Sequence, residues 1–238
     1  MTETAWWHTQ GMAEPVTSEG ARGPGRPPRL SRDAVVTAAE SIVARDGIDA
    51  LTMRRVAREL RSSPMALYRH VRDKDELLVL LLDRLVDQLP RPALPEDPRA
   101  RLVALWRLLH DGLDRHPWVV EVLVKGHLIA RSVLWVMEEI LAAFVAAGLT
   151  HRQAVAAYRA TWQFTVGVLT VRHGLARTAA SGRPRLQVSV LTSADPRELP
   201  TLAAVASLWA AVGEDYEDGL TALLDGLLSR GPGPRPRP

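Results

Sequence analysis

The chain has 238 residues, of which 47% are hydrophobic and 24% charged, and this is enough apolar material for one large or two modest domains. It contains no cysteine, which excludes a disulfide framework, a thiolate metal site and a cysteine nucleophile. No apolar run approaches the ~18 residues of a membrane-spanning helix, and the N-terminus lacks the basic-then-apolar layout of a signal peptide. We therefore expect a soluble, cytoplasmic protein.

Both ends of the chain are expected to be disordered, over residues 1–21 and 231–238, although the pair Trp6-Trp7 is unusual for a solvated tail. Residues 22–30 are rich in Gly, Pro and Arg. They suggest a basic arm in which Arg26 and Arg29 contact phosphates or the DNA minor groove. A plain flexible linker with incidental charge is the alternative.

Residues 31–89 contain signals for four helices. Ser31 is the expected cap of a helix over residues 33–46, which Gly47 ends. Thr52 caps a second helix, and Ser63 followed by Pro64 starts a third. Asp73 and Glu76 form a capping-box pattern that begins a fourth helix, running to about residue 89.

The second and third of these helices, over residues 52–71, have the outline of a helix-turn-helix, with Leu67 and Val71 facing the core. An αα-hairpin in an all-helical core would look the same. Charge favours DNA binding, because residues 22–74 carry 12 Lys and Arg against 6 Asp and Glu, while the whole chain has a net charge of only +3.

The segments LTMRRVAREL and PMALYRHVRDKDELL resemble the TetR family of one-component transcriptional regulators over about residues 29–85. The family usually has Gly at the turn where this chain has Arg61, which suggests mild strain there. The resemblance implies phosphate contacts from Thr52, Arg54 and Lys74. It places a groove-facing set on the third helix, with Ser63 as its cap: Pro64, Met65, Ala66, Tyr68, Arg69 and His70.

Chemistry agrees with these roles. Arg69 is the best candidate for bidentate recognition of guanine, and Met65 or Ala66 could meet a thymine methyl group. Tyr68 suits a phosphate better than a base, with half-burial against the first helix as its alternative. Arg55 and Arg58 are expected to be solvated or close to phosphate.

Pro90, Pro92, Pro95 and Pro98 separate this unit from a second domain over residues 99–230. Helical signals there cover about 99–115, 117–125, 128–147, 151–174, 199–212 and 214–229, with a loop at 177–198. Strand signals are weak. The predicted fold is all-α, with an N-terminal helix-turn-helix domain and a C-terminal helical bundle for ligand binding and dimerisation.

Two of these helices, 151–174 and 214–229, have apolar residues on more than one face. A helix of this kind can bury one face in its own domain and another in a two-fold dimer, as the resemblance also implies. Central helices of a monomer are the alternative. The candidate interface residues are Val155, Tyr158, Tyr216, Leu220, Leu223, Leu224 and Leu227.

Aromatic and histidine residues concentrate between residues 106 and 173 and suit a cavity for a flat, hydrophobic effector. Core packing is the alternative for each one. The candidates are Trp106, His110, Trp118, His127, Trp135, Met137, Trp162, Gln163, Phe164 and Thr165. The tetracycline-repressor branch has a metal-ligating His where this chain has Gln163, so we expect no metal and no other cofactor.

No HExxH, phosphate loop or G-x-S-x-G pattern is present, and the seven histidines lack ligand spacing, so we expect no enzyme. We predict a repressor that binds a palindromic DNA operator as a homodimer and is released by a small hydrophobic effector. A nonspecific nucleic-acid binder or a helical protein-interaction module is the competing hypothesis. Operator preference of ~10³-fold or more over random DNA would separate them.

Overall fold

The structure, a computed structural model, describes residues 30–126, 128–181, 186–208 and 215–229, and these are helical with no strand. The N-terminal unit comprises α1 (Arg32–Asp46), the 3-10 turn η1 (Ile48–Ala50), α2 (Met53–Glu59), α3 (Pro64–Leu67) and α4 (Lys74–Asp87). The C-terminal bundle comprises α5 (Pro98–Asp114), α6 (Pro117–Leu123), η2 (Arg131–Val133), α7 (Leu134–Ala146), α8 (His151–Ala180), α9 (Leu186–Thr192), α10 (Pro200–Val205) and α12 (Tyr216–Leu228). The all-α fold is confirmed.

Side-chain caps begin the helices of the N-terminal unit where the sequence predicts them. Ser31, Thr52, Ser63 and Asp73 each accept a hydrogen bond from the backbone N–H three residues later. Each cap satisfies one of the N–H groups that a helix start leaves without an intrahelical partner. α1 ends at Gly47, whose φ of +80° glycine adopts without strain.

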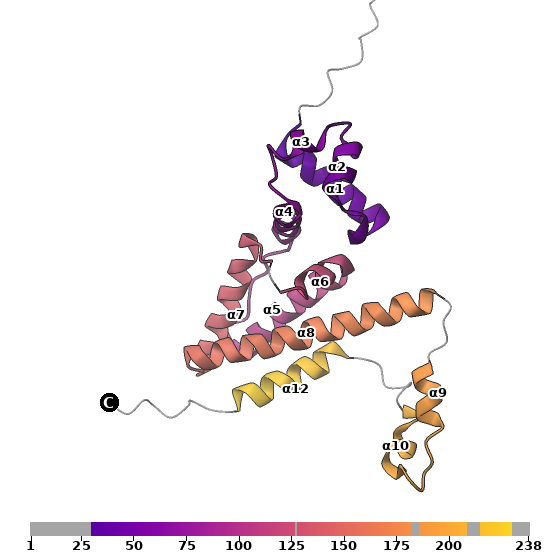
Figure 1. Cartoon of the computed structure of the whole chain (residues 1–238). Coiled ribbons are helices and arrows are strands. Elements are labelled where there is room, and N and C mark those ends of the chain that lie inside the picture. The colour runs from indigo at the N-terminus through magenta and orange to yellow at the C-terminus, as the bar shows by residue number, and fades with distance from the viewer. Residues whose placement is uncertain (1–29, 127, 182–185, 209–214, 230–238) are drawn as a thin grey trace, which may run out of the picture.

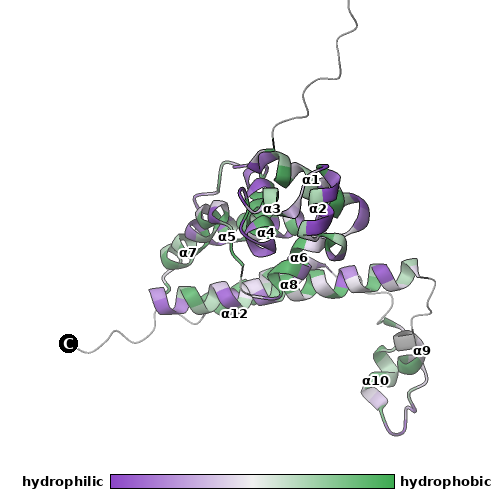
Figure 2. Cartoon of the chain, turned by 45° about the horizontal axis from the view of Figure 1, so that its top comes forward, coloured by the Kyte–Doolittle hydropathy of each residue, from purple (hydrophilic) through white to green (hydrophobic). Residues whose placement is uncertain are grey.

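Two hydrophobic cores hold the chain together. In the first, the buried faces of α1 to α4 pack with Val119, Val120 and Val122 of α6, so the N-terminal unit shares its core with the bundle. In the second, α5, α7, α8 and α12 pack around Trp106 and Phe144. α8 crosses the molecule with α12 alongside it, whereas α9 and α10 lie apart from the other helices (Figures 1 and 2).

Three predicted boundaries in the bundle are wrong. The expected loop 177–198 is partly helix, since α8 continues to Ala180 and α9 occupies Leu186–Thr192. The helix expected from residue 128 begins only at Leu134, after the 3-10 turn η2, where the backbone N–H and hydroxyl of Ser132 donate hydrogen bonds to Asp83 of α4. The helix expected over 199–212 ends at Val205, and residues 209–214 lie outside the described residues.

Candidate DNA-binding surface and ligand cavity

The outer face of α3 is exposed, while its inner face is buried. Leu67, the last residue of α3, and Val71, in the segment after it, are 0% and 1% exposed and pack in the first core. The prediction that the third helix extends to residue 71 is wrong, because α3 ends at Leu67 and Tyr68, Arg69 and His70 lie in the turn that follows. Met65 is 75% exposed and Tyr68 47%, which is high for large apolar side chains. The remaining predicted groove residues differ in exposure, with Ser63, Pro64 and Arg69 exposed and Ala66 and His70 half-buried. This exposed face combines apolar, hydroxyl and basic side chains, which are the kinds that contact base edges in the major groove.

Basic residues around α3 fall into two groups. Arg32, Arg45, Arg55, Arg72 and Arg84 pair with carboxylates of the same unit, for example Arg55 with Asp46 at 2.7 Å and Arg84 with Glu40 at 2.9 Å. Five others have no ion pair among the residues that the structure describes: Arg54, Arg58, Arg61, Arg69 and Lys74. Only the second group has its charge free for phosphates.

Of the two alternatives for Arg55, solvated or close to phosphate, full solvation is wrong, because the side chain pairs with Asp46 and its Nε atom is buried. Thr52 uses its hydroxyl as the cap of α2, accepting from the N–H of Arg55 at 3.1 Å. Arg26 and Arg29 lie outside the described residues.

The turn between α2 and α3 is strained at Arg61. Its φ of +48° places an ordinary side chain in the left-handed region, the one such case among the described non-glycine residues. This conformation costs about 1–2 kcal/mol in a residue with a Cβ atom. The presence of Arg61 where the family usually has glycine therefore strains the backbone at this turn. It also leaves an unpaired guanidinium group beside α3.

A cavity of about 420 Å³ with mostly apolar walls lies between α4 and the bundle. We call it the apolar cavity. One wall is α4, through Leu82, Leu85 and Val86, together with Leu89 just beyond its end. The opposite walls come from α5, α6, the stretch 128–133, α7 and α8. Its volume lies within the ~300–1,000 Å³ of small-molecule sites. The few polar groups on its wall include the Tyr158 hydroxyl, whose pKa burial raises, so that it stays protonated and able to donate.

Of the predicted ligand residues, only Met137 and Trp162 line the apolar cavity. Trp106, His110, Phe164 and Thr165 lie instead between α5, α8 and α12, where Trp106 and Thr165 are fully buried. Trp135 lies under the guanidinium of Arg91, 4.9 Å from its ring centroid, and Gln163 is exposed. Trp118 lines a different cleft, and His127 lies outside the described residues.

Sequence reasoning missed the aliphatic residues that form most of this cavity, among them Leu109, Leu113, Val119, Leu123, Ile129 and Val133. Leucine and valine on an amphipathic helix look alike whether they face a core or a cavity. No local signal could have found them.

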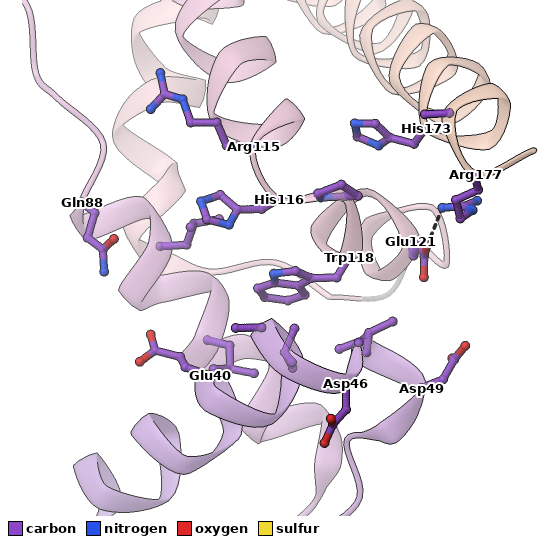
Figure 3. Close-up of a pocket in the computed structure, with 18 residues that line it drawn as sticks. Glu40, Asp46, Asp49, Gln88, Arg115, His116, Trp118, Glu121, His173 and Arg177 are labelled. Carbon is purple, nitrogen blue, oxygen red and sulfur yellow. Dashed lines mark hydrogen bonds and ion pairs between the residues drawn. The ribbon is translucent and has the colours of Figure 1, made fainter. Parts of the chain in front are cut away.

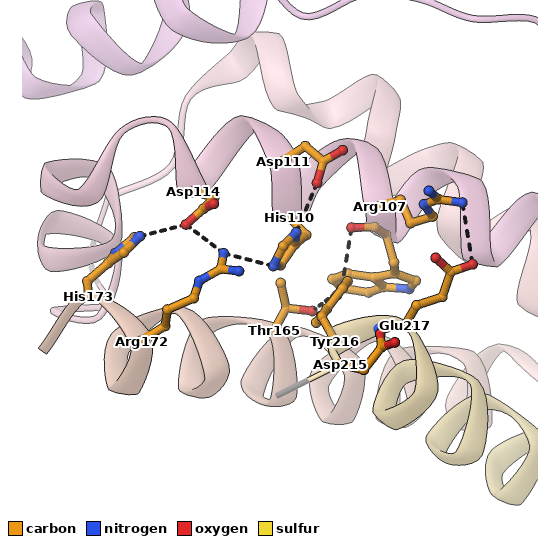
Figure 4. Close-up of polar contacts among 11 residues, drawn as sticks. Arg107, His110, Asp111, Asp114, Thr165, Arg172, His173, Asp215, Tyr216 and Glu217 are labelled. Carbon is orange, nitrogen blue, oxygen red and sulfur yellow. Dashed lines mark hydrogen bonds and ion pairs between the residues drawn. The ribbon is translucent and has the colours of Figure 1, made fainter. Parts of the chain in front are cut away.

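A row of polar side chains joins α5 to α8 and α12 instead of forming a site (Figure 4). The His110 ring stacks on Tyr216 with centroids 3.9 Å apart, and Arg172 donates to His110 Nε2 at 3.1 Å. Burial opposes ionisation of Asp114, but the hydrogen bond from His173 and the charge of Arg172 outweigh it and lower the pKa of Asp114. The row stabilises the bundle.

Tyr216, Leu220 and Leu224 cannot belong to a dimer interface, because α5 and α8 of the same chain bury all three. Tyr158 is half-buried and lines the apolar cavity. Val155 is exposed, and Leu223 and Leu227 are half-buried, with Leu227 at the edge of the second core. These three remain candidates for a contact with a second copy.

Two family models match the chain. Residues 35–81 match the model described as bacterial regulatory proteins of the tetR family, and residues 91–230 match the tetracyclin repressor-like C-terminal domain. The chain is 34% identical over 221 residues to the HTH-type transcriptional repressor DrrR1 of Streptomyces coeruleorubidus, covering 87% of this chain and 80% of that protein. It is also 34% identical over 165 residues to an HTH-type transcriptional regulator of Saccharopolyspora erythraea, covering 63% and 68%.

A solved structure agrees with these matches. Apo ActR from Streptomyces coelicolor superposes with a TM-score of 0.72 at 25% identity, covering 86% of this chain and 99% of ActR. No described helix is long and apolar enough to cross a membrane. The exposed face of α3, the unpaired cations around it and both family models lead to one conclusion: the chain is a DNA-binding transcriptional regulator of the TetR family.

Proposed function

We propose that the protein is a repressor that binds a near-palindromic operator as a homodimer and is released when a small hydrophobic or aromatic effector enters the apolar cavity. The observation that carries this proposal is the position of α4. Its first residue, Lys74, follows the recognition helix α3 by a short turn, and its last two turns form a wall of the apolar cavity. A ligand that displaces α4 therefore also displaces α3.

Thermodynamic linkage explains how a ligand in the apolar cavity would change the affinity for DNA. A ligand changes DNA affinity by as much as its own affinity differs between the two positions of α4. The nearly all-apolar lining selects a hydrophobic molecule, and Tyr158 supplies one donor. Structures of ActR have been solved in complex with actinorhodin and with (S)-DNPA, which supports effector binding in this fold. DrrR1 is named a repressor, which supports the sign of regulation.

A homodimer through α8 and α12 would explain why apolar side chains remain uncovered there. Val155 is 48% exposed on α8, and Leu223 and Leu227 are only half-buried on α12. Two copies related by a two-fold axis would present their α3 helices about one DNA turn apart, ~34–36 Å, and so recognise a palindrome.

Selection of bound duplexes from a random DNA pool, at about physiological salt, tests the proposal. Wild-type protein should recover a two-fold-symmetric site. Arg69→Ala should relax the base preference at one position in each half-site, at a cost of about 1–3 kcal/mol. Arg197→Ala, at an exposed position far from α3, should recover the wild-type site. Recovery of no consensus would favour a nonspecific polyanion binder.

A further inference from the structure

A second cleft, distinct from the apolar cavity, lies between the N-terminal unit and the bundle (Figure 3). We call it the interdomain cleft. The C-terminal end of α1 and η1 form one wall, and the α5–α6 turn, α6 and the end of α8 form the other. Its volume is about 760 Å³, and Leu85 is the one residue that lines both it and the apolar cavity. A ligand here would contact both parts of the protein at once.

The floor of the interdomain cleft is aromatic and aliphatic. Trp118, the second residue of α6, is half-buried against the first core, with its indole directed toward α1 in Figure 3. Val43, Leu81 and Leu85 line the cleft beside it. An indole face that is partly open to a cavity offers a stacking surface for a flat ring system.

Carboxylates outnumber guanidinium groups on the walls of the interdomain cleft. Four carboxylates line it, from Glu40, Asp46, Asp49 and Glu121, against the two guanidinium groups of Arg115 and Arg177. The C-terminus of α1, a helix of 15 residues, adds the negative end of its dipole to the same wall as three of these carboxylates.

Not all four carboxylates are available to a ligand. Glu40 pairs with Arg84 at 2.9 Å, Asp46 with Arg55 at 2.7 Å, and Glu121 with Arg177 at 2.9 Å. Asp49, exposed in η1, has no partner among the described residues, and neither does Arg115, exposed just after α5. Burial, with Arg115 beside it, lowers the pKa of His116, so this ring is neutral at pH 7 and does not repel a cation.

We propose that the interdomain cleft is a second ligand site, which binds a flat aromatic cation. The ring stacks on Trp118 of the bundle, and its positive charge faces Asp49 of the N-terminal unit. Since the two contacts come from opposite walls, the bound molecule resists any motion that separates the N-terminal unit from α6. The site thus acts on the position of α3 through contacts that, apart from Leu85, the effector in the apolar cavity does not make.

This site can be tested with two probes that bind the full chain in the absence of DNA. Proflavine is a planar aromatic cation at pH 7, and acridone is its neutral counterpart. Fluorescence anisotropy should show proflavine binding at least about tenfold more tightly than acridone, the effect of one charge-assisted contact. Asp49→Asn should remove most of that difference, and Trp118→Phe should weaken both probes. Amide exchange of η1 and α6 should slow in wild type when proflavine is bound.

Two control variants locate the binding. Glu138→Gln removes an exposed carboxylate of α7 outside the cleft, and Ile129→Trp narrows the apolar cavity at an exposed lining residue. Both should bind proflavine like wild type. Equal affinity for proflavine and acridone, or loss of binding in Ile129→Trp but not in Asp49→Asn, would overturn the proposal. Because no DNA is present, this outcome is independent of operator binding.

Discussion

Asp83 of α4 accepts two hydrogen bonds from Ser132 in η2, from the backbone N–H at 2.9 Å and from the hydroxyl at 2.7 Å, both on the same carboxylate oxygen. The two residues are 49 positions apart, and both are half-buried. Ala130 and Val133, on either side of Ser132, line the apolar cavity, as do Leu82 and Leu85 of α4. This contact therefore ties together two walls of one cavity.

Removing the hydrogen bonds between Asp83 and Ser132 should destabilise the packing of α4 against η2. We expect Asp83→Ala to lower the free energy of unfolding by about 1–3 kcal/mol, because it leaves the N–H of Ser132 without its acceptor. Ser132→Ala, which removes one of the two hydrogen bonds, should cost about 1 kcal/mol. Urea unfolding measures both. Equal costs for the two variants would contradict the assignment of both bonds to Asp83.

Two glycines of α12 should respond in opposite directions to alanine. A Cβ atom at Gly219 would lie 2.7 Å from Cζ of Phe164, whereas nothing lies within 4 Å of a Cβ at Gly226. Gly219→Ala should therefore destabilise the protein by about 1–3 kcal/mol through overpacking. Gly226→Ala should stabilise it by about 0.5–1 kcal/mol through helix propensity. Thermal unfolding of the two variants side by side tests the packing of α12 on α8.

Arg54 and Arg55 are neighbours that should behave differently. Arg54 has no ion pair among the described residues, so Arg54→Ala should weaken binding to all DNA sequences and reduce the salt slope of log K by about 1. Arg55 pairs with Asp46, so Arg55→Ala should leave that slope unchanged and cost under about 1 kcal/mol of stability. A salt titration of DNA affinity separates the two roles. A reduced slope in Arg55→Ala would show that this arginine leaves Asp46 for phosphate.

Arg61→Gly should relieve the strain at φ +48°. We expect the free energy of unfolding to rise by up to about 1 kcal/mol, since glycine adopts this conformation freely but loses more backbone entropy on folding. DNA affinity should fall at the same time, because an unpaired cation beside α3 is lost. Arg61→Asn, which also tolerates the left-handed region, should show the same loss of affinity.

Tyr216 should make the protein sensitive to alkali. Burial raises the pKa of Tyr216 to about 12 from its usual value of 10.0, while the hydrogen bond to Thr165 acts in the opposite direction. A raised pKa in the folded state gives stability that is complete below pH 10 and is lost as pH rises from 10 to about 12. The loss should be on the order of 2 kcal/mol.

Tyr216→Phe should have lower stability at neutral pH, since Thr165 loses a partner at 2.8 Å, but a flatter profile between pH 10 and 12. Denaturant unfolding across that range makes the comparison. Parallel pH profiles for wild type and Tyr216→Phe would mean that another group titrates.

Much of the DNA-binding surface could be predicted from sequence because it is locally encoded. The four caps, the buried pair Leu67 and Val71 and the exposed α3 residues follow from spacing within one or two helical turns. The ligand cavity could not be predicted in this way. Trp106 and Trp162 are equally plausible in the sequence, yet the first is fully buried in the core and the second lines the cavity.

Residues within a few positions of one another decide that this chain is helical, where its N-terminal helices begin, and which face of α3 is free to meet DNA, because a cap or a helical face is a local property. Long-range packing decides which arginines are free, which apolar residues enclose a cavity, and which face of α12 is already covered. Those outcomes depend on residues distant in the chain, such as Arg84 with Glu40 and Tyr216 with Thr165, that meet only when whole helices pack.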